Sequence, residues 1–339
     1  MILVTGGTGL VGSHLLYKLV SNNNNNVKAI YRRQHTLERV KHVFSYYSNQ
    51  AENLFNSIEW IEANINDVPK LEVVFKDITH VYHCAAFVSF EPNKYYELRK
   101  INIEGTANIV NLCITNQIKK LCYISSIAAI GHHSNPEQLI SETTSWNPED
   151  DNSVYAITKY GAEMEVWRGT QEGVNAVVVN PGIILGPGFW KSGGSGSLFK
   201  KIYSGLKYYT NGVSGYVDVW NVVDAMCELM SSKIQNERFI LVSENLSFND
   251  FQKSVSKALN VKPAKKEASS LLLELAWRLD WLSHKLLGKR RRFSKQLAKS
   301  VRSKTIYDNT KIKKVLDFEF NPIDKSISKT AGFFLKDQN

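Results

Sequence analysis

The sequence predicts an α/β protein, built on a doubly wound parallel sheet with a smaller, discontinuous C-terminal domain. Three observations predict this fold class. Short apolar runs alternate with longer amphipathic stretches through the first half of the 339-residue chain. A glycine-rich turn separates the first apolar run from the first amphipathic stretch. After residue 181 the alternation loosens into a region rich in Gly, Pro and Ser.

The apolar runs and amphipathic stretches locate the elements in chain order. The expected strands are residues 2–4, 27–31, 58–61, 80–83, 121–124, 176–179 and 239–242. The expected helices are residues 12–21, 37–47, 68–76, 95–115, 155–169, 248–259 and 269–287. Strands that alternate with helices indicate right-handed crossovers and a parallel sheet covered on both faces. We expect a first domain over 1–185, to which 215–243 return in part, and a second formed by 186–214 and 244–339.

Composition narrows the class of protein. A hydrophobic content of 43% and 20 glycines are typical of a soluble globular chain. Neither a membrane-spanning apolar run nor a signal peptide is recognisable, so we expect a cytoplasmic protein. The four cysteines form no CxxC pair and stand at no metal-ligand spacing to histidine. We therefore expect buried, reduced thiols and no metal site.

The glycine-rich turn predicts a dinucleotide-binding site. Gly6, Gly9 and Gly12 recur at three-residue spacing directly after the first strand. In such a turn the glycines allow a tight bend, a close approach of the backbone to a pyrophosphate and close packing of the following helix. The anion then binds at the helix N-terminus. The residues expected to contact the dinucleotide here are Gly6, Thr8, Gly9, Leu10, Val11 and Gly12.

Arginine after the second strand favours NADP over NAD. An acidic residue there would bind the ribose hydroxyls of NAD, but the chain has Arg32 and Arg33. Arginine suits a 2′-phosphate, and Arg39, further along, is placed to close on the same group. The alternative interpretation is that the arginines only mark an exposed strand end.

Several ordered motifs over residues 1–230 resemble the extended short-chain dehydrogenase/reductases, especially the dihydroflavonol-4-reductase-like and 3β-hydroxysteroid dehydrogenase-like branch. They are TGGTGLVG at 5–12, HCAA at 83–86, NIEGT at 102–106, YISS with Gly131 following, the pair Tyr155 and Lys159, and NPG at 180–182. The resemblance implies further cofactor contacts at Asn64, Ile65, Cys84, Ala85, Ala86, Asn102, Tyr155, Lys159, Pro181, Gly182, Ile184 and Ser197.

The sequence departs from the family pattern in three places. Asn64 stands where the family usually has Asp, although an amide can also bond the adenine amine. Trp220 and Asn221 replace a common Arg-Asp or similar polar pair, which leaves the usual contacts of that segment open. Ile130 replaces a tyrosine before the glycine.

The resemblance implies a catalytic set of Ser126, Tyr155 and Lys159. Reduction of a ketone needs a proton donor, and a free phenol has a pKa of ~10. Lys159 is one helical turn beyond Tyr155, so its charge is expected to lower the pKa of the phenol. Ser126 would donate a hydrogen bond to the substrate oxygen. Ser125 and Tyr160 are the less favoured alternatives to Ser126 and Tyr155.

The substrate side is expected to be apolar. Phe87, Val88 and Ala128 are candidate pocket residues, and no arginine clamp is apparent. This favours a small apolar or cyclic alcohol or ketone over a nucleotide sugar. An epimerase or dehydratase acting on a nucleotide-linked sugar is the enzymatic alternative, and a cofactor-bound RNA-binding or regulatory protein is the non-enzymatic one. A homodimer is also kept as an expectation.

Residues 262–314 contain sixteen Lys and Arg against four Asp and Glu, a local net charge of +12 within a total of +10. Trp277, Trp281, Leu282 and Leu286 recur there at helical spacing. We expect an ordinary helix whose apolar stripe lies in the core of the second domain. The alternatives are an interfacial membrane helix and an RNA-binding surface.

Overall fold

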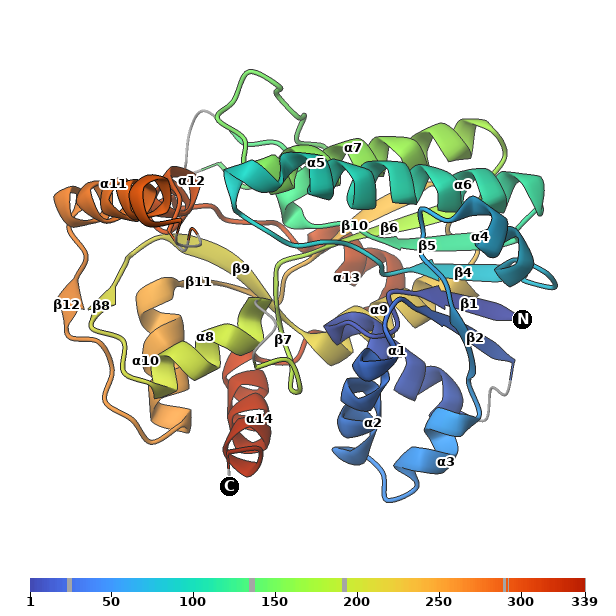
Figure 1. Ribbon diagram of the computed structural model, residues 1–339, viewed down its shortest axis with the longest axis horizontal. Helices are drawn as coiled ribbons and strands as arrows, with labels where there is room; N and C mark the ends of the chain where they lie inside the picture. Colours follow the sequence, from blue (N-terminus) through green and yellow to red (C-terminus); the bar gives the residue numbers. More distant parts are fainter. Residues whose placement is uncertain (23–25, 134–137, 191–193, 289–290, 292, 339) are drawn as a thin grey trace.

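The computed structural model describes residues 1–22, 26–133, 138–190, 194–288, 291 and 293–338 (Figure 1). Its centre is a seven-stranded parallel sheet in the order β10-β6-β5-β4-β1-β2-β3. The strands are β1 (Ile2–Thr5), β2 (Val27–Tyr31), β3 (Glu59–Glu62), β4 (His80–His83), β5 (Lys120–Ile124), β6 (Ala176–Pro181) and β10 (Glu237–Leu241). All seven expected strands are confirmed, and the order reverses beside β1, as in a doubly wound fold.

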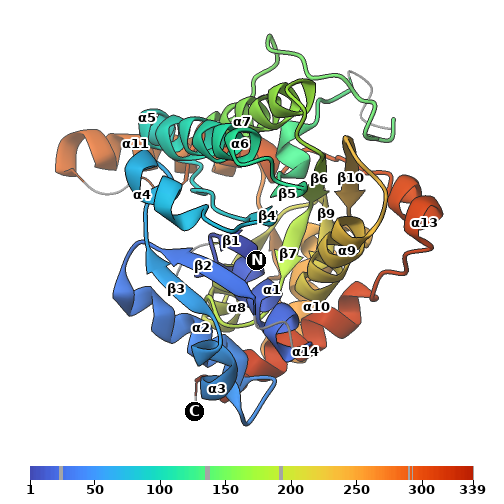
Figure 2. The same cartoon turned by 90° about the vertical axis from the view of Figure 1, so that its right-hand side faces the viewer.

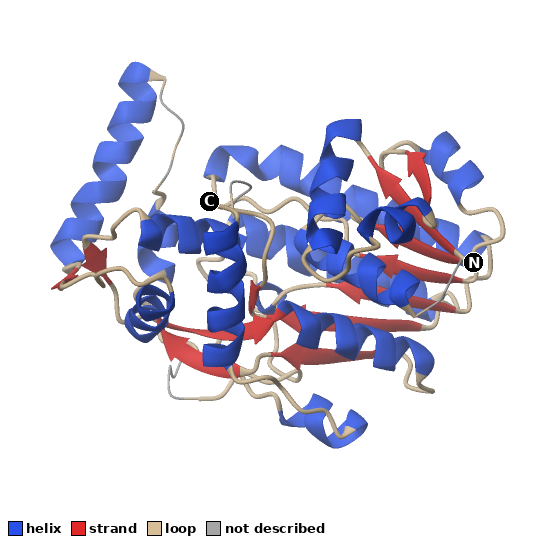
Figure 3. Cartoon of the chain, turned by 90° about the horizontal axis from the view of Figure 1, so that it is seen from below, coloured by secondary structure: helices blue, strands red, loops and turns tan. Residues whose placement is uncertain are grey.

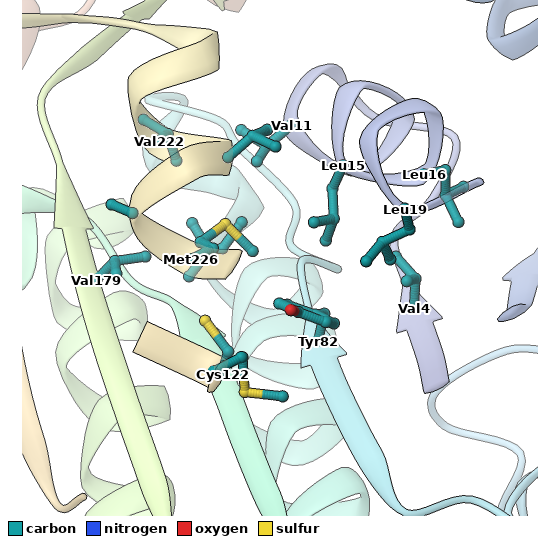
Figure 4. Close-up of a cluster of buried hydrophobic side chains, with 14 of the residues drawn as sticks. Val4, Val11, Leu15, Leu16, Leu19, Tyr82, Cys122, Val179, Val222 and Met226 are labelled. Atoms are coloured by element: carbon teal, nitrogen blue, oxygen red, sulfur yellow. The ribbon is translucent and has the colours of Figure 1, made fainter. Parts of the chain in front are cut away.

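A hydrophobic cluster covers each face of this sheet. Neighbouring residues of a strand point to opposite faces and so belong to different clusters. Val4 belongs to the hydrophobic cluster on one face, and Leu3 belongs to the cluster on the other. Figure 4 shows the first cluster, where α1 (Leu10–Ser21) and α9 (Val219–Ser231) pack on the sheet. The strands are apolar in consecutive positions because water reaches neither face.

Figure 2 shows how the helices divide between the two faces of the sheet. On one side lie α4 (Val68–Val74), α5 (Tyr95–Leu98), α6 (Gly105–Thr115) and α7 (Val154–Gln171). On the other side lie α1, α2 (Leu37–Ser45), α3 (Ala51–Asn56) and α9. The single helix expected over 95–115 is α5 and α6 joined by a π-helical segment, η3 (Arg99–Glu104). Short 3₁₀ turns are η1 (Gln34–Thr36), η2 (Pro92–Lys94) and η4 (Ile127–Ala129).

A second group of elements has its own hydrophobic cluster, formed largely by Phe199, Tyr216, Phe251 and Phe334. Its sheet has the order β11-β9-β7, with β7 (Ile183–Leu185), β9 (Val213–Asp218) and β11 (Glu244–Ser247). The helices α8 (Gly194–Tyr203), α10 (Phe248–Ala258) and α14 (Ile323–Lys336) pack around it. In Figure 3 this group lies at the end of the molecule opposite the N-terminus.

The remaining elements lie toward the C-terminus. They are β8 (Tyr208–Tyr209), β12 (Lys266–Glu267), α11 (Ser270–Leu287), α12 (Lys295–Ser300) and α13 (Thr310–Leu316). Helix α13 returns to the large sheet, where Ile312 joins the first cluster. Of the four cysteines, Cys113 and Cys122 are buried as expected, whereas Cys84 and Cys227 are only partly buried.

The apolar stripe of α11 is not in a core, which contradicts the sequence-based expectation. Trp281, Leu282 and Leu286 are 43%, 42% and 70% exposed, and only Trp277 joins a small cluster with α12. The expectation was wrong because helical periodicity shows that a stripe shares one face, not that another element covers it. Among the described residues, no helix combines the length and apolarity that crossing a bilayer requires.

Candidate active site

The glycine loop has the geometry that a pyrophosphate site requires. Gly6 has a φ of 69°, and a Cβ atom there would lie 2.5 Å from the backbone nitrogen of Ala85. A Cβ atom on Gly12 would collide with the carbonyl oxygen of Gly6. Gly9 is the N-cap of α1, and no side chain caps the helix. The N–H groups of the first turn are therefore available to a phosphate, which fits a dinucleotide.

Arg32 lies at the same sheet edge as the glycine loop. Strands β1 and β2 are parallel neighbours, so their carboxyl ends, and the residues that follow them, lie side by side. Arg32 and Arg39 are both exposed. No described acidic side chain forms an ion pair with either of them. Two uncommitted guanidinium groups fit an anionic group of the cofactor beyond its pyrophosphate.

Residues after β3 and β4 complete this edge. Asn64 is exposed, and its Oδ1 accepts the Asn66 N–H at 3.1 Å, while Ile65 is buried. The Cys84 N–H donates to the Thr5 carbonyl, which fixes the exit of β4 beside β1.

Asn102, in the π-helical segment, ties the loop after β4 to α7. Its Oδ1 accepts the Phe87 N–H at 2.7 Å, and its Nδ2 donates to the Phe87 carbonyl at 3.0 Å and to Thr158 Oγ1 at 3.1 Å. The amide is buried and committed to these bonds. In this structure Asn102 therefore positions the loop at residues 84–90, and π-helical turns are frequent at functional sites.

The structure brings Tyr155 and Ser126 together. Helix α7 begins at Ser153, whose Oγ accepts the Ala156 N–H at 3.1 Å, so Tyr155 lies in the first turn. Ser126 lies two residues after β5, and its hydroxyl is close enough to the Tyr155 phenol to influence its ionisation. Burial raises the pKa of Tyr155 to about 12, and the Ser126 hydroxyl opposes that rise. The phenol is thus protonated at neutral pH.

Lys159 lies beneath this pair, with only 1% of its surface exposed. Its Nζ donates to the Tyr123 hydroxyl at 2.7 Å and to the Ile124 carbonyl at 2.8 Å. Burial lowers the pKa of Lys159 to about 7, although Glu163 opposes that shift. The expected lowering of the Tyr155 pKa by Lys159 is not seen in this structure. The ammonium is turned towards β5, and burial dominates at the phenol.

Glu163 is a site residue that the sequence interpretation missed. It follows Lys159 by one further helical turn and is fully buried. Its carboxylate accepts the Ser125 hydroxyl at 2.5 Å and the Asn180 amide at 2.9 Å, and it pairs with Arg238 at 3.0 Å. An acidic residue on the sheet-facing side of an amphipathic helix was the available signal, because a buried charge requires partners.

The hydrogen bonds of Glu163 distinguish Ser125 from Ser126. Ser125 is committed to Glu163, whereas Ser126 is half-buried and influences the ionisation of Tyr155. The Asn180 amide also donates to the Ser126 carbonyl at 3.0 Å. Of the two serines, Ser126 is therefore the one whose hydroxyl is placed to act with Tyr155. The alternative tyrosine, Tyr160, stacks instead on a tryptophan with ring centroids 4.5 Å apart.

Exposed apolar side chains belong to the loop beside Tyr155. The ring of Phe90 meets that of Tyr155 edge-on, with centroids 5.4 Å apart. Phe90 is 48% exposed and Val88 is 54% exposed. Of the other candidate pocket residues, Phe87 is half-buried, and the Ala128 N–H donates to Ser126 Oγ at 3.1 Å. The predicted substrate residues therefore lie on two loops, after β4 and after β5, that reach Tyr155 and Ser126.

The segment after β6 is less closely tied to the catalytic pair. Gly182 packs so close to β9 that a Cβ atom would collide with the Gly215 carbonyl. The carbonyl of Ile184 accepts a serine hydroxyl from α8. Ser197 donates to a carbonyl within α8, 2.7 Å away. The Gly- and Ser-rich sequence of residues 186–197 predicts a loop that could fold over the substrate. Residues 191–193 of that loop lie outside the described residues.

Trp220 and Asn221, at the start of α9, contact residues of other elements. Trp220 packs edge-on against His14 and Tyr47, with centroid distances of 5.3 and 4.9 Å. Asn221 Oδ1 accepts the Asn321 N–H at 2.9 Å. Trp220 also lines a cavity of about 490 Å³ beside α14, which none of the catalytic candidates lines. These two residues thus join α9 to other parts of the chain, away from Tyr155.

Comparison with known proteins identifies relatives of this chain. A family model described as "NAD dependent epimerase/dehydratase family" matches residues 2–241. A "Putative dihydroflavonol 4-reductase" from Synechocystis sp. is 28% identical over 84% of this chain and 79% of its own length. "Sterol demethylase protein B" from Methylococcus capsulatus is 24% identical over 72% of this chain and 70% of its own length.

A solved structure shares the fold. The UDP-glucose 4-epimerase of Thermotoga maritima, determined with UDP-glucose, superposes with a TM-score of 0.76. It is 24% identical and covers 100% of this chain and 99% of its own. Further relatives include cinnamoyl-CoA reductases and a 3β-hydroxysteroid-dehydrogenase/decarboxylase, which confirms the branch that the motifs resemble. The chain therefore belongs to the NAD-dependent epimerase/dehydratase family of enzymes.

Proposed function

We propose that this protein is an NADP-preferring oxidoreductase that interconverts an apolar or cyclic ketone and the matching secondary alcohol. The observation that carries the proposal is that Ser126 influences the Tyr155 phenol beside the exposed ring of Phe90. An acid and a hydrogen-bond donor placed together suit a substrate oxygen that changes its charge. The Phe90 ring beside them suits an apolar substrate skeleton.

The chain's own groups would each perform one part of the reaction. The nicotinamide cofactor, when bound, supplies or accepts the hydride. Tyr155 gives its proton to the substrate oxygen during reduction, and its pKa of about 12 keeps that proton in place until then. Ser126 stabilises the charge that develops on the same oxygen. Lys159, one turn below, is bonded to the Tyr123 hydroxyl and the Ile124 carbonyl and does not lower the pKa of Tyr155 in this structure, so its proposed part is to hold the cofactor.

The residues proposed to hold the cofactor lie near the carboxyl ends of the strands of the large sheet. The glycine loop and the first turn of α1 would take the pyrophosphate. Arg32 and Arg39 would take a 2′-phosphate, which is the basis for preferring NADP. Tyr155 and Lys159 would hold the nicotinamide ribose, as the family resemblance implies.

A second candidate function is epimerisation or dehydration of a nucleotide-linked sugar. The shared fold with a UDP-glucose 4-epimerase favours it. In that reaction the hydride returns to the substrate, so no cofactor is consumed overall. Of the described residues beside Tyr155, however, Val88 and Phe90 are apolar and exposed and would not clamp a nucleoside diphosphate.

Net cofactor turnover distinguishes the two functions. The purified protein is incubated with NADPH or NADH and a panel of cyclic ketones, and both cofactor oxidation and alcohol formation are measured. We expect stoichiometric oxidation of NADPH with at least one ketone, and slower oxidation of NADH. Tightly bound NAD in the purified protein, epimerisation of UDP-glucose and no ketone-dependent oxidation would together contradict the proposal.

A further inference from the structure

The exposed face of α11 carries a row of leucines that nothing else in the described chain covers. Leu271, Leu275, Leu279, Leu282 and Leu286 are 77%, 57%, 62%, 42% and 70% exposed. At 3.6 residues per turn these positions fall within an arc of about 80°, so they form one continuous stripe. We call these five residues the leucine stripe. An apolar row this long on a soluble surface marks an interaction site.

The opposite face of α11 already has its partner. Leu273 is buried in a small cluster with Ala298 of α12, and Trp277 packs against the same cluster. The helix has a complete boundary at each end, because Ser269 Oγ accepts the Leu272 N–H and Gly288 ends the helix with a φ of 63°. The helix is therefore a defined element with one face packed and one face free.

The charges around the leucine stripe are positive. Arg278 and Lys285 are exposed and flank the stripe on the same side of the helix. The acidic residues of α11 are internally paired: Glu274 with Arg278 and Arg302, and Asp280 with Arg291. More widely, exposed basic residues on this part of the chain include Lys262, Lys265, Lys266, Lys295, Lys299 and Lys304. The leucine stripe thus has Lys285 and the paired Arg278 beside it, and it belongs to a part of the chain with an excess of exposed basic residues.

We propose that the leucine stripe docks the protein on the surface of a bilayer that contains anionic phospholipids. An interfacial helix of this kind buries its apolar face at the boundary between headgroups and acyl chains, while Lys and Arg contact the headgroup phosphates. Helix α11 has 18 residues, about 27 Å, and does not qualify as a span. The ammonium of Lys285 lies 5.1 Å from the ring centre of Trp281, which is an arrangement suited to that boundary.

The location of α11 links this docking surface to the catalytic end of the molecule. Figure 1 shows α11 and α12 at the end of the molecule where α5 and α7 begin. Lys299 of α12 lies 3.1 Å from Asp151, four residues before Tyr155. A protein lying on the leucine stripe would therefore hold its catalytic end near the lipid. The docking proposal itself does not depend on the substrate of the enzyme.

Vesicle binding tests the proposal directly. The full chain is mixed with vesicles of phosphatidylcholine alone or of phosphatidylcholine with phosphatidylglycerol, and the bound fraction is measured by flotation. We expect binding to the anionic vesicles, weaker binding at high salt and little binding to the neutral ones. The double substitution Leu275→Glu/Leu282→Glu should weaken binding by at least ~10-fold, because each loses buried apolar surface.

Val73→Glu is the matched control, because Val73 is 57% exposed on α4, far along the chain from α11. Combined with Val68→Glu, at a valine 38% exposed on the same helix, it adds the same two charges, and this control should leave vesicle binding unchanged. Both variants should retain the thermal unfolding midpoint of the parent chain, which shows that they fold. Absence of binding to anionic vesicles would overturn the proposal. So would a dimer that Leu275→Glu/Leu282→Glu converts to a monomer, or RNA binding without lipid binding.

Discussion

Helices α7 and α11 each have 18 residues, and each begins at a serine whose hydroxyl accepts an N–H of the first turn. Their faces are used in opposite ways. Helix α7 buries ionisable groups, Lys159 and Glu163, against the large sheet. Helix α11 leaves leucines in water, as at Leu271 and Leu286. Length and capping therefore do not distinguish a catalytic helix from a docking helix.

The two helices differ in what offsets an unfavourable free energy, which comes from buried charges in α7 and from exposed leucines in α11. A buried carboxylate is tolerated only when other groups bond it, and Glu163 has Ser125, Asn180 and Arg238. The exposed leucines of α11 are covered by nothing in the described part of the chain, and we propose that a lipid surface covers them. The first arrangement indicates internal chemistry, and the second indicates binding.

The largest effect is expected from a substitution of the buried Glu163 on α7. Glu163→Gln should lower the free energy of unfolding by about 3 kcal/mol, because it leaves Arg238 without its buried anion. Chemical denaturation measures the change. The control is Glu165→Gln, which removes a half-exposed pair with Arg168 on the same helix and should cost less than about 1 kcal/mol. Equal losses in the two variants would contradict the assigned role of the network.

The next effect concerns the exposed edge of the nucleotide site. Arg32→Ala should weaken NADPH binding by about 2 kcal/mol, because it removes a charge-assisted contact to a phosphate. NADH binding should change little, since that cofactor lacks the 2′-phosphate. Fluorescence titration with both cofactors gives the two affinities. A similar loss for both would show that Arg32 does not read the phosphate.

The pH dependence sharpens the account of Lys159. Its pKa of about 7 predicts that ketone reduction slows as pH rises through that value, because the ammonium loses its proton. Glu163 raises this pKa, so Glu163→Gln should move the midpoint to lower pH. Rates measured against pH in both proteins give the direction. A midpoint that moves to higher pH in the variant would refute the assigned interaction.

The lowered pKa of Lys159 also predicts how the free energy of unfolding changes with pH. The folded chain releases the Lys159 proton near pH 7, whereas the unfolded chain keeps it to about 10.5. The free energy of unfolding contributed by this group should therefore rise with pH between those values. Lys159→Met should remove that part of the pH dependence in denaturation experiments.

The smallest effect is expected from a substitution in the exposed leucine stripe of α11. Leu279→Gln on α11 should change the free energy of unfolding by no more than about 0.5 kcal/mol, because Leu279 is 62% exposed. The contrast is Leu273→Ala, which opens the buried cluster beneath and should cost at least about 2 kcal/mol. If both substitutions cost the same, the exposed face would have to be covered in solution.

The elements and residues that follow fixed spacings were predictable from the sequence. The seven strands of the large sheet, the glycine loop and the pairing of Tyr155 with Ser126 depend on local patterns and on the motifs of one family. The partner of Glu163 was not predictable, because Arg238 lies 75 residues away on β10 and only the strand order brings it close. The exposure of α11 was not predictable either, because an apolar stripe looks the same whether or not another element covers it.

The central claim is that Tyr155 transfers the proton in a net redox reaction. Its most direct measurement is NADPH-dependent ketone reduction by Tyr155→Phe beside Tyr160→Phe, a ring that stacks on Trp146 away from Ser126. The account predicts that Tyr155→Phe loses about 10²–10⁴-fold in turnover while NADPH affinity is unchanged, and that Tyr160→Phe keeps turnover. Parent-level turnover by Tyr155→Phe would contradict it.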